Sequence, residues 1–346
     1  MFILVQARQW KRMIAAALCV ALLTAVGGVL CQRTAAADAQ KADFIKWVDF
    51  DVTYEAMDKA LKLDIASHET PGEIPLNWVE LLAYLAAKNG GDFSRYRAGQ
   101  MDALVEELRG GKTMEQLTEN MKYYGYYKEA YGAALGGFVG EYEIQVADDT
   151  APDGKKWVRK YGLKAFLPIA KNYPYTDYDD FGTSRSYGFK RTHLGHDFMG
   201  ATGTPIIAVE GGTVEALGWN QYGGWRIGIR SLDKKRYYYY AHLRQNFPFN
   251  KSLKVGSVVQ PGDVIGYLGH TGYSTQENVN NIKEPHLHFG MQLIFDESQK
   301  ESDNEIWIDV YAITRLLYRN RCEVVKDPET KEYSRVYAYR EVEPGT

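Results

Sequence analysis

Residues 205–217, with the sequence PIIAVEGGTVEAL, decide the fold, because two short apolar runs there are separated by a pair of glycines. Short runs rich in Val and Ile and bounded by glycine are typical of the two strands of a β-hairpin. The same pattern recurs at residues 225–230 and 236–242, and again at residues 258–268. The sequence therefore predicts an antiparallel, all-β region.

A different periodicity precedes this region, from about residue 43 to residue 143. The clearest predicted helix begins at Asn77, whose spacing to Glu80 is that of a helix N-cap, and it stops at Asn89-Gly90-Gly91. Further helices are expected over residues 100–108 and from Thr113 onward. We interpret this part of the chain as a small helical domain.

Five tyrosines, at positions 123, 124, 126, 127 and 131, gather near the end of the helical part. Tyr123, Tyr127 and Tyr131 would share one face of a helix, so we expect them to line the core of the helical domain. An aromatic platform for glycans is the alternative interpretation.

The chain thus divides into segments of different character, and its predicted fold class is multidomain α + β. The β part is expected to be an all-β antiparallel domain with a barrel-like or sandwich-like sheet. The predicted boundaries are a helical domain at 40–146, a linker at 147–163, the β domain at 164–320 and a charged, peripheral tail at 321–346. The linker is predicted from its polar residues together with Pro152 and Gly154.

The first 37 residues resemble an export signal. Arg8, Lys11 and Arg12 precede an apolar run over residues 13–30, and small residues follow at 35–39. The run also has about the length that spans a bilayer, so an uncleaved membrane anchor is the alternative. In both cases we expect the rest of the chain outside the cytoplasm, either extracellular and cell-wall associated or anchored to the outer face of the membrane.

Charge and cysteine content exclude several classes of protein. The formal net charge is −3, with no basic patch that would indicate a nucleic-acid partner. Cys19 and Cys31 lie in the leader, where twelve helical residues would hold them about 18 Å apart, beyond disulfide reach. Cys322 is therefore expected to be unpaired, and a disulfide framework is excluded for the mature chain. Nothing in the pattern predicts an oligomeric state.

The sequence HLGHD at residues 193–197 has the residue types of a metal site. A helix would put His193 and Asp197 on one face, but Gly195 and the glycines that follow disfavour a helix. A straight strand would separate the two by about 13 Å, too far for donors that each lie about 2 Å from one metal. We therefore expect a bend at Gly195, a residue type that permits one.

A second histidine motif, PHLHF, occupies residues 285–289. On a strand, His286 and His288 would point to the same face, while Leu287 and Phe289 pack on the other. One histidine can bind a metal while its neighbour serves the reaction. A further histidine, His242, follows four tyrosines on a predicted strand, on a common face with Tyr238 and Tyr240.

Two imidazoles and one carboxylate are the donors of catalytic rather than closed structural zinc sites, because they leave one coordination position open. Zinc in such a site lowers the pKa of water to about 7 and polarises a peptide carbonyl. No His-Glu-x-x-His helix supplies a glutamate base, since His68-Glu69 is followed by Thr-Pro-Gly. A histidine, with an ordinary pKa near 6.5, fits the role of the base.

At these motifs the sequence resembles the lysostaphin-type zinc endopeptidases that cut peptidoglycan peptides. The resemblance runs from about Tyr173 to Phe295. Besides the His-x-Gly-x-Asp and His-x-His motifs, it includes the segments GTP at 203–205, YAHL at 240–243, VQPGDVIG at 259–266 and GHTG at 269–272.

The resemblance implies a role for each matching residue. It makes His193, Asp197 and His288 the Zn²⁺ ligands, and it makes His242 and His286 the catalytic pair. His286 would be the general base, with His242 stabilising the developing oxyanion, although the sequence leaves this division of labour open. The implied site is a narrow groove, floored by an antiparallel sheet, that accepts a thin, flexible peptide.

The chain departs from the short family pattern at residues 276–283, an insertion that would lengthen one wall of the groove. His196 should point away from the metal and play a structural part, and His270 should be a loop residue. Trp219 and Trp225 are assigned equally to the groove and to the core.

The predicted function is that of an exported zinc metalloendopeptidase that hydrolyses stem or cross-bridge peptide bonds of peptidoglycan. One alternative is a peptidoglycan-binding or assembly protein on the same fold without turnover. Another is an activator of other wall hydrolases, acting through the helical domain. The expected partners are peptidoglycan peptides, and the only expected contact with a membrane is an uncleaved N-terminal segment.

Overall fold

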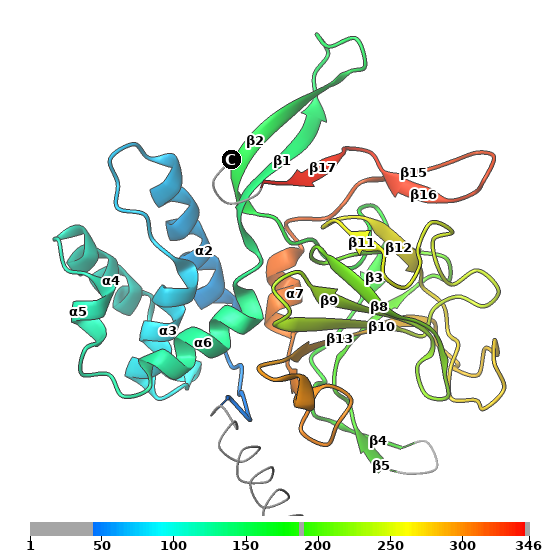
Figure 1. Ribbon diagram of the computed structural model, residues 1–346, viewed down its shortest axis with the longest axis horizontal. Helices are drawn as coiled ribbons and strands as arrows, with labels where there is room; N and C mark the ends of the chain where they lie inside the picture. Colours follow the sequence, from blue (N-terminus) through cyan, green and yellow to red (C-terminus); the bar gives the residue numbers. More distant parts are fainter. Residues whose placement is uncertain (1–43, 187–189, 343–346) are drawn as a thin grey trace, which may run out of the picture. The chain divides into compact units, whose positions relative to one another are not determined.

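The computed structural model describes residues 44–186 and 190–342 (Figure 1). The predicted leader, residues 1–37, lies outside the described residues. Within the described ranges, no helix has both the length and the apolar character needed to cross a membrane. The described residues from Ile45 onward belong to one compact unit.

The helical part follows the predicted pattern closely. Asn77 caps its helix by accepting a hydrogen bond from the Glu80 backbone N–H, and Gly90 ends it at φ 70°. Thr113 caps a later helix in the same way, through the Gln116 backbone N–H. The elements are α2 (Tyr54–Glu69), α3 (Trp78–Asn89), η1 (Phe93–Arg95), α4 (Ala98–Arg109), α5 (Met114–Thr118) and α6 (Tyr124–Leu135).

The tyrosine-rich segment is divided between core and surface. Tyr131 is fully buried and packs edge-on against Phe50, with ring centroids 5.3 Å apart. Tyr127 is partly buried, whereas Tyr123 is 56% exposed. The core interpretation is therefore confirmed at Tyr131 and wrong at Tyr123, because Tyr123 is the N-cap of α6 and lies outside the helix.

A β-hairpin replaces the predicted linker. Strand β1 (Val139–Ala147) pairs antiparallel with β2 (Lys155–Leu163) over their full lengths, so only the turn between them is irregular. The predicted linker at 147–163 is wrong in this respect, and so is the assignment of residues 139–146 to the helical domain. The polar Pro–Gly segment is a turn, and the residues after it continue as strand.

The C-terminal segment is also more structured than predicted. Strand β17 (Tyr339–Glu341) pairs with β1 and so completes a three-stranded sheet, while β15 (Val324–Lys326) pairs with β16 (Tyr333–Arg335). The Tyr339 side chain is 7% exposed and stacks on Tyr142. The prediction of a peripheral tail at 321–346 is therefore wrong, because this segment buries aromatic surface.

The main sheet has eight strands and is antiparallel throughout. Its order is β11-β8-β9-β10-β13-β6-β3, with β14 also paired to β13. The described strands leave two ends, β11 and β3, so the sheet is open and not a closed barrel. Its strands are β3 (Tyr175–Thr176), β6 (His196–Gly200), β8 (Gly212–Asn220), β9 (Gly224–Ser231), β10 (Arg236–Ala241), β11 (Val258–Val259), β13 (His286–Leu293) and β14 (Ile306–Ile308).

The stretch at 205–217 forms two strands, as predicted, but not a hairpin. Strand β7 (Pro205–Ile207) pairs with β12 (Val264–Tyr267), whereas β8 pairs with β9. The connecting residues 208–211 are buried, and Glu210 among them accepts hydrogen bonds from Arg236. The connection therefore runs through the interior and separates the two strands.

The remaining elements are a short hairpin and a closing helix. Strands β4 (Ser184–Ser186) and β5 (Lys190–Thr192) pair with each other, and η2 (Glu297–Gln299) follows β13. The apolar stretch 306–317 forms β14 first and then the short helix α7 (Tyr311–Leu317). Helix α7 lies between the helices and the main sheet and contacts α2 (Figure 1).

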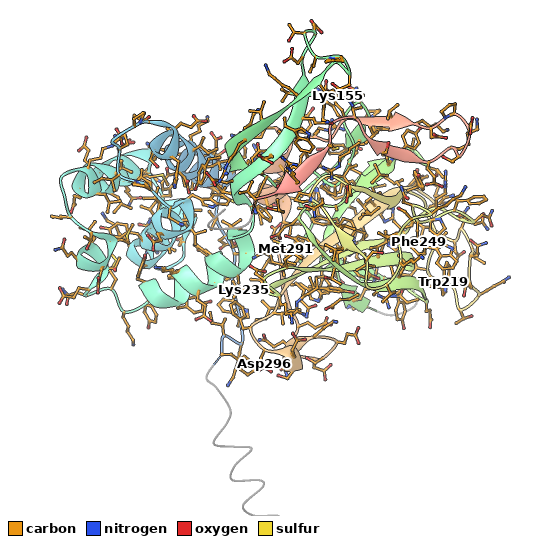
Figure 2. The ribbon with its side chains drawn as sticks, turned by 45° about the horizontal axis from the view of Figure 1, so that its top comes forward. Lys155, Trp219, Lys235, Phe249, Met291 and Asp296 are labelled. Atoms are coloured by element: carbon orange, nitrogen blue, oxygen red, sulfur yellow. The ribbon has the colours of Figure 1, made fainter. Side chains whose placement is uncertain are left out.

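One hydrophobic core runs through the helices and the main sheet. It includes Trp78 on α3, Tyr131 on α6, and Phe198 and Leu287 on the sheet. Met291 on β13 is 1% exposed, and Figure 2 labels its position among the side chains of the molecule. The structure therefore differs from the predicted division into a helical and a β domain, because the two parts share their buried surface.

Candidate active site

Neighbouring strands bring the two histidine motifs together. In the register of β6 and β13, Asp197 lies opposite His288. His193 precedes β6, and the chain bends at Gly195, as the sequence predicts. Leu287 and Phe289 are buried on the other face of β13, which confirms the predicted alternation.

Three candidate donor atoms converge at this point. His193 Nε2 lies 3.1 Å from Asp197 Oδ1 and 3.0 Å from His288 Nδ1. His288 Nδ1 lies 2.9 Å from Asp197 Oδ1. Among the described residues these three side chains form the cluster whose ligand atoms could hold a metal ion.

Gly195 does more than permit the bend. A Cβ atom at this position would lie 2.5 Å from His288 Cε1 and 2.6 Å from His288 Nε2. Both separations are shorter than van der Waals contact, so the His288 ring occupies space that only glycine leaves free. The glycine of the first motif thereby positions a ligand of the second.

The surroundings favour a charged carboxylate at Asp197. Burial alone would raise the pKa of Asp197, but hydrogen bonds with His193 and His288 hold it far below its usual value. On the outer side, His193 Nδ1 lies 3.0 Å from Asp180 Oδ1. A carboxylate behind a histidine ligand orients the ring and increases its basicity.

The donor set fits a divalent transition metal. Two imidazole nitrogens and one carboxylate oxygen lie within about 3 Å of each other, and all three side chains are largely buried. Imidazole and carboxylate ligands suit zinc, with each donor about 2 Å from the ion. In the absence of a metal, Nε2 of His193 and Nδ1 of His288 would face each other with one proton at most between them.

The two remaining histidines of the predicted site lie beside the cluster. The His242 and His286 rings are 4.8 Å apart, centroid to centroid, and the His242 and His288 rings are 5.9 Å apart. His286 Nε2 lies 4.0 Å from Asp197 Oδ1. All five side chains singled out in the sequence are therefore brought together.

Backbone carbonyls hold both of these histidines. His242 Nδ1 lies 2.9 Å from the Thr271 carbonyl oxygen, and His286 Nδ1 lies 2.8 Å from the Glu284 carbonyl oxygen. A carbonyl oxygen only accepts hydrogen bonds, so each neutral ring carries its proton on Nδ1 and leaves Nε2 as an acceptor. Burial lowers the pKa of His242 well below its ordinary value, an effect strengthened by His286 and His288.

His242 reaches the site in a way that strand alternation does not predict. Strand β10 ends at Ala241, and His242 has φ 61°. Tyr238 and Tyr240 face Phe289 on the opposite side of the sheet. The prediction of a common face for Tyr238, Tyr240 and His242 is therefore wrong, because the left-handed residue redirects the ring.

Further side chains line a cleft of about 210 Å³ around the five residues. Arg185 contacts Asp197, with Nη2 3.1 Å from Oδ2, and also pairs with Asp180. The Arg191 guanidinium stacks on Tyr273, 4.6 Å from the ring centroid. These residues were not predicted, since a lone arginine or tyrosine carries no spacing signal.

The β region of the chain matches a known family model. Residues 191–302 match the model of peptidase family M23. Over these residues the chain is similar to the peptidases of this family, and we refer to the matched region as the M23 domain.

Known proteins resemble the M23 domain over limited lengths. The L-Ala–D-Glu endopeptidase of Bacillus subtilis is 42% identical over 131 residues, which is 38% of each chain. Lysostaphin of Staphylococcus simulans is 39% identical over 98 residues, or 28% of this chain and 17% of lysostaphin. The chain thus spans well under half of these relatives.

One solved structure resembles more of the chain. It is that of lytM from Ruminococcus gnavus, a candidate glycyl-glycine endopeptidase, with a TM-score of 0.50 and 23% sequence identity. The similarity covers 81% of this chain and 93% of that one. It shows that the fold, including more than the M23 domain, recurs in a second protein.

Other sequence predictions concern the surroundings of the M23 site. His196 is 2% exposed and points away from the three donors to Asp177, with Nε2 2.9 Å from Oδ2. His270 contacts the Ile282 carbonyl oxygen at 2.8 Å and so fastens the segment 276–283, whose Ile282 lines the cleft. Both agree with the predicted roles.

The two tryptophans are partly buried by packing and do not line the cleft. Trp219 and Trp225 pack edge-to-face at 5.6 Å, and Trp225 also packs edge-to-face against Phe249. The Trp225 indole N–H donates to Asn278 Oδ1. Of the two interpretations that the sequence left open, the structure supports packing.

Proposed function

We propose that the M23 domain is a zinc metalloendopeptidase that hydrolyses peptide bonds of peptidoglycan. The observation that carries this proposal is the convergence of three donors with two further histidines in one cleft. Each of the five side chains would be unremarkable alone, since isolated histidines usually serve packing. Together they supply a metal site and a separate pair of proton-transfer groups.

The residues divide into two sets by chemistry. His193, Asp197 and His288 would hold the ion. A zinc ion bound there supplies Lewis-acid activation of water and of the peptide carbonyl. The chain then has to orient the peptide, accept a proton from the attacking water and deliver one to the leaving amine.

His286 is suited to the proton transfers. Its Nδ1–H is held by the Glu284 carbonyl, which leaves Nε2 free to accept a proton from water and later donate it to the leaving nitrogen. It borders the cleft rather than the interior, at 12% side-chain exposure. A proton acceptor in that place reaches a peptide lying in the cleft.

His242 is suited to stabilising charge on the carbonyl oxygen. It is buried with Nδ1–H fixed by Thr271, so its Nε2 has a fixed direction. In the neutral ring Nε2 accepts a hydrogen bond from a water molecule, and the other hydrogen of that water would stabilise the developing oxyanion. The two histidines thus differ in exposure, which matches different tasks.

The names of relatives support a wall peptide as substrate. One relative is an L-Ala–D-Glu endopeptidase and another, from Staphylococcus capitis, is the glycyl-glycine endopeptidase ALE-1. A cleft of about 210 Å³ accommodates a few residues of extended peptide and excludes a folded protein. We therefore propose stem or cross-bridge peptides, outside the cytoplasm, where the predicted leader would direct the chain.

Zinc analysis and mass spectrometry of cell-wall digests test the proposal. The purified full chain should bind about one zinc and release fragments with newly opened peptide bonds from defined peptidoglycan. His193→Ala should lose both properties, and His286→Ala should keep zinc and lose turnover. The matched control is His68→Ala, a histidine outside the cleft, which should keep both.

Two outcomes would contradict the proposal. One is undiminished digestion by His193→Ala protein that carries no zinc. The other is full activity of a protein in which both His242 and His286 are changed to Ala. If the fragments were opened only at glycosidic bonds, the protein would be a glycan hydrolase and not a peptidase.

A further inference from the structure

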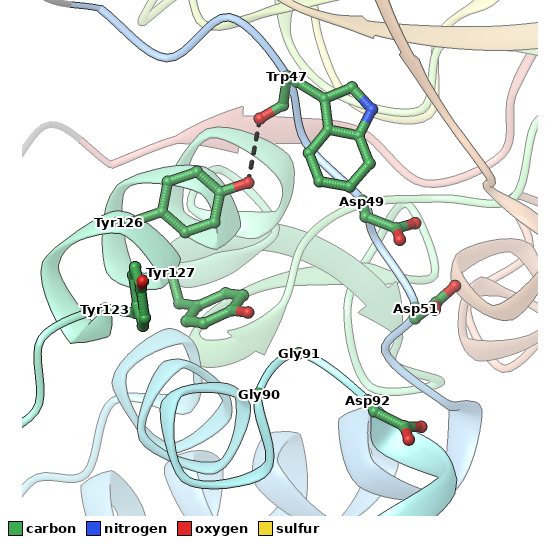
Figure 3. Close-up of a pocket in the computed structure, with 9 residues that line it drawn as sticks. All are labelled: Trp47, Asp49, Asp51, Gly90, Gly91, Asp92, Tyr123, Tyr126 and Tyr127. Carbon is green, nitrogen blue, oxygen red and sulfur yellow. Dashed lines mark hydrogen bonds between the residues drawn. The ribbon is translucent and has the colours of Figure 1, made fainter.

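A second cleft lies in the helical part of the unit, apart from the M23 site. It has a volume of about 480 Å³, and it is bounded by the extended segment before α2, by the glycine turn after α3 and by the start of α6 (Figure 3). Four aromatic side chains line it: Trp47, Tyr123, Tyr126 and Tyr127. Neither the proposed hydrolysis nor the family match uses this cleft.

Local contacts fix the walls of the cleft. The Tyr126 hydroxyl donates to the Trp47 carbonyl oxygen at 3.0 Å and joins α6 to the extended segment (Figure 3). Gly91 has φ 85°, and a Cβ there would lie 2.5 Å from the Tyr127 hydroxyl. The glycine turn thus makes room for Tyr127. The indole of Trp47 is 67% exposed and stands at the edge of the cleft.

Three carboxylates lie along the same cleft, and its lining contains no lysine or arginine. Asp92 pairs with Arg95, with Oδ2 3.0 Å from Nε. For Asp49 and Asp51, no ion pair or side-chain hydrogen bond to another described residue is found. Partial burial raises the pKa of Asp51, and repulsion from Asp49 and Asp92 adds to the effect. The cleft therefore carries uncompensated negative charge.

The spacing of the carboxylates decides between kinds of cation. Among the described residues, three side chains with ligand atoms within 4.8 Å of one another occur at the M23 site, and the three aspartates do not form such a group. A bare metal ion, which needs its ligands that close, is therefore disfavoured. An organic cation is larger, and it is attracted both by carboxylates and by the faces of aromatic rings.

We propose that the cleft formed by Trp47, Tyr126, Tyr127 and the aspartates 49, 51 and 92 binds an alkylammonium group of a peptide. The rings take the apolar stem, and the carboxylates take the charged end. The group can come from a lysine-type side chain or from a free α-amino terminus. This binding goes beyond the proposed hydrolysis and does not depend on it.

Calorimetric titration of the full chain with small amines tests the proposal. The probes are Nα-acetyl-lysine methylamide, which has a free side-chain ammonium, and its Nε-acetylated form, which has the same apolar stem and no charge. The first should bind saturably, and the second should bind at least about tenfold more weakly. Glycine methylamide carries its ammonium at the α position, so its binding would show that the cleft takes a free α-amino terminus.

Charge-removing variants localise the binding. Asp51→Asn and Asp49→Asn should each weaken binding of the charged probe by about three- to tenfold, with unchanged thermal unfolding. Asp303→Asn removes the same charge at an exposed position outside the cleft and should leave binding within about twofold of the original. Tyr123→Leu removes one ring without changing charge and should also weaken binding.

Several results would overturn the proposal. These are equal binding of the charged and acetylated probes, or equal loss in Asp303→Asn and Asp51→Asn. Binding of N-acetylglucosamine oligomers that is unaffected by Asp51→Asn would assign the cleft to neutral sugars instead. The His193→Ala protein should bind the charged probe normally, so failure of the zinc peptidase proposal is distinguishable from failure here.

Discussion

At the scale of single residues, the candidate metal site depends on residue 195 having no Cβ atom. Gly195 leaves the space in which the His288 ring lies. Gly195→Ala should displace that ring and weaken zinc binding by at least about tenfold, with a parallel loss of hydrolysis. Zinc affinity measured by competition with a chelator checks this.

A matched glycine change separates the local effect from a general one. Gly99 lies in the first turn of α4, and a Cβ there would meet nothing within 4 Å. Gly99→Ala should keep zinc affinity and should not lower stability, because Ala is the better helix former. Equal zinc affinity in Gly195→Ala and Gly99→Ala proteins would contradict the assigned role of Gly195.

The sequence predicts some residue positions better than others, for a physical reason. His286 and His288 could be placed on one face because strand alternation is local. The direction of His242 could not, since its left-handed φ of 61° departs from the strand and its ring is held by the Thr271 carbonyl, which is distant in sequence. Asp180 was missed likewise, because an aspartate behind a histidine has no fixed spacing.

At the scale of elements, the turn at 269–272 holds the end of β10. The Thr271 hydroxyl donates to the Leu243 carbonyl oxygen at 2.6 Å and accepts from the Trp225 backbone N–H at 3.1 Å. Thr271→Val should leave both groups unpaired in the interior, at a cost of about 1–3 kcal/mol in the free energy of unfolding. It should also lower kcat, because the Thr271 carbonyl orients His242.

The conservative variant distinguishes positioning from packing. Thr271→Ser keeps the hydroxyl and should retain most of kcat, although it loses the methyl group. Zinc content should be unchanged in both proteins, since Thr271 contacts none of the three donors. A Thr271→Ser protein as impaired as Thr271→Val would show that the methyl group, and not the hydrogen bonds, is what matters.

The pairing of strands was harder to predict than their existence. Apolar runs and glycines located β7 and β8, but their separation depends on burial of residues 208–211 against Arg236 and Tyr238. Helix ends were predicted well, because caps such as Asn77 and Gly90 act within a few residues. Contacts within an element are thus visible in the sequence, and contacts between elements are not.

At the scale of the whole molecule, a buried ion pair joins the helices to the sheet. Arg236 is fully buried, donates to both oxygens of Glu210 at 2.8 and 2.9 Å, and donates to the Ala133 carbonyl oxygen at the end of α6. Arg236→Met would leave the buried Glu210 carboxylate without its positive charge, with the Tyr238 hydroxyl still donating to it. The free energy of unfolding should fall by about 3–5 kcal/mol.

This prediction also tests whether helices and sheet unfold together. With one shared core, circular dichroism, which the helices dominate, and tryptophan fluorescence, to which the sheet residues Trp219, Trp225 and Trp307 contribute, should give coincident urea transitions, both shifted by Arg236→Met. Arg159→Met, which breaks an exposed pair with Glu141, should leave both transitions nearly unchanged. A helical signal that is unaffected by Arg236→Met would restore the independent helical domain that the sequence predicts.

The domain division was predicted wrongly for a reason that concerns the whole molecule. The sequence pattern is helical to about residue 143 and strand-like after residue 164, and this change suggests a boundary between them. Whether two adjoining regions share a core depends on which apolar faces meet, and that is a property of the packed chain. Tyr339, in the segment assigned to a peripheral tail, is buried against Tyr142 for the same reason.

Burial of the Cys322 thiol in the C-terminal region should make the free energy of unfolding depend on pH in the alkaline range. Cys322 is free and 6% exposed, and burial raises its pKa from 9.0 to about 11. Because the folded-state pKa is the higher one, this contribution is fully present below pH 9 and is lost as pH rises through 11. The difference in the free energy of unfolding between the original protein and Cys322→Ala should therefore narrow over this range, by up to about 1.4 kcal/mol per pH unit.

Urea unfolding of both proteins at pH 8, 9.5 and 10.5 measures this difference, and the contributions of Cys19 and Cys31 cancel because both proteins retain them. A difference that stays constant would mean that the thiol ionises in the folded chain as readily as in the unfolded one, and that the packing around residue 322 admits water.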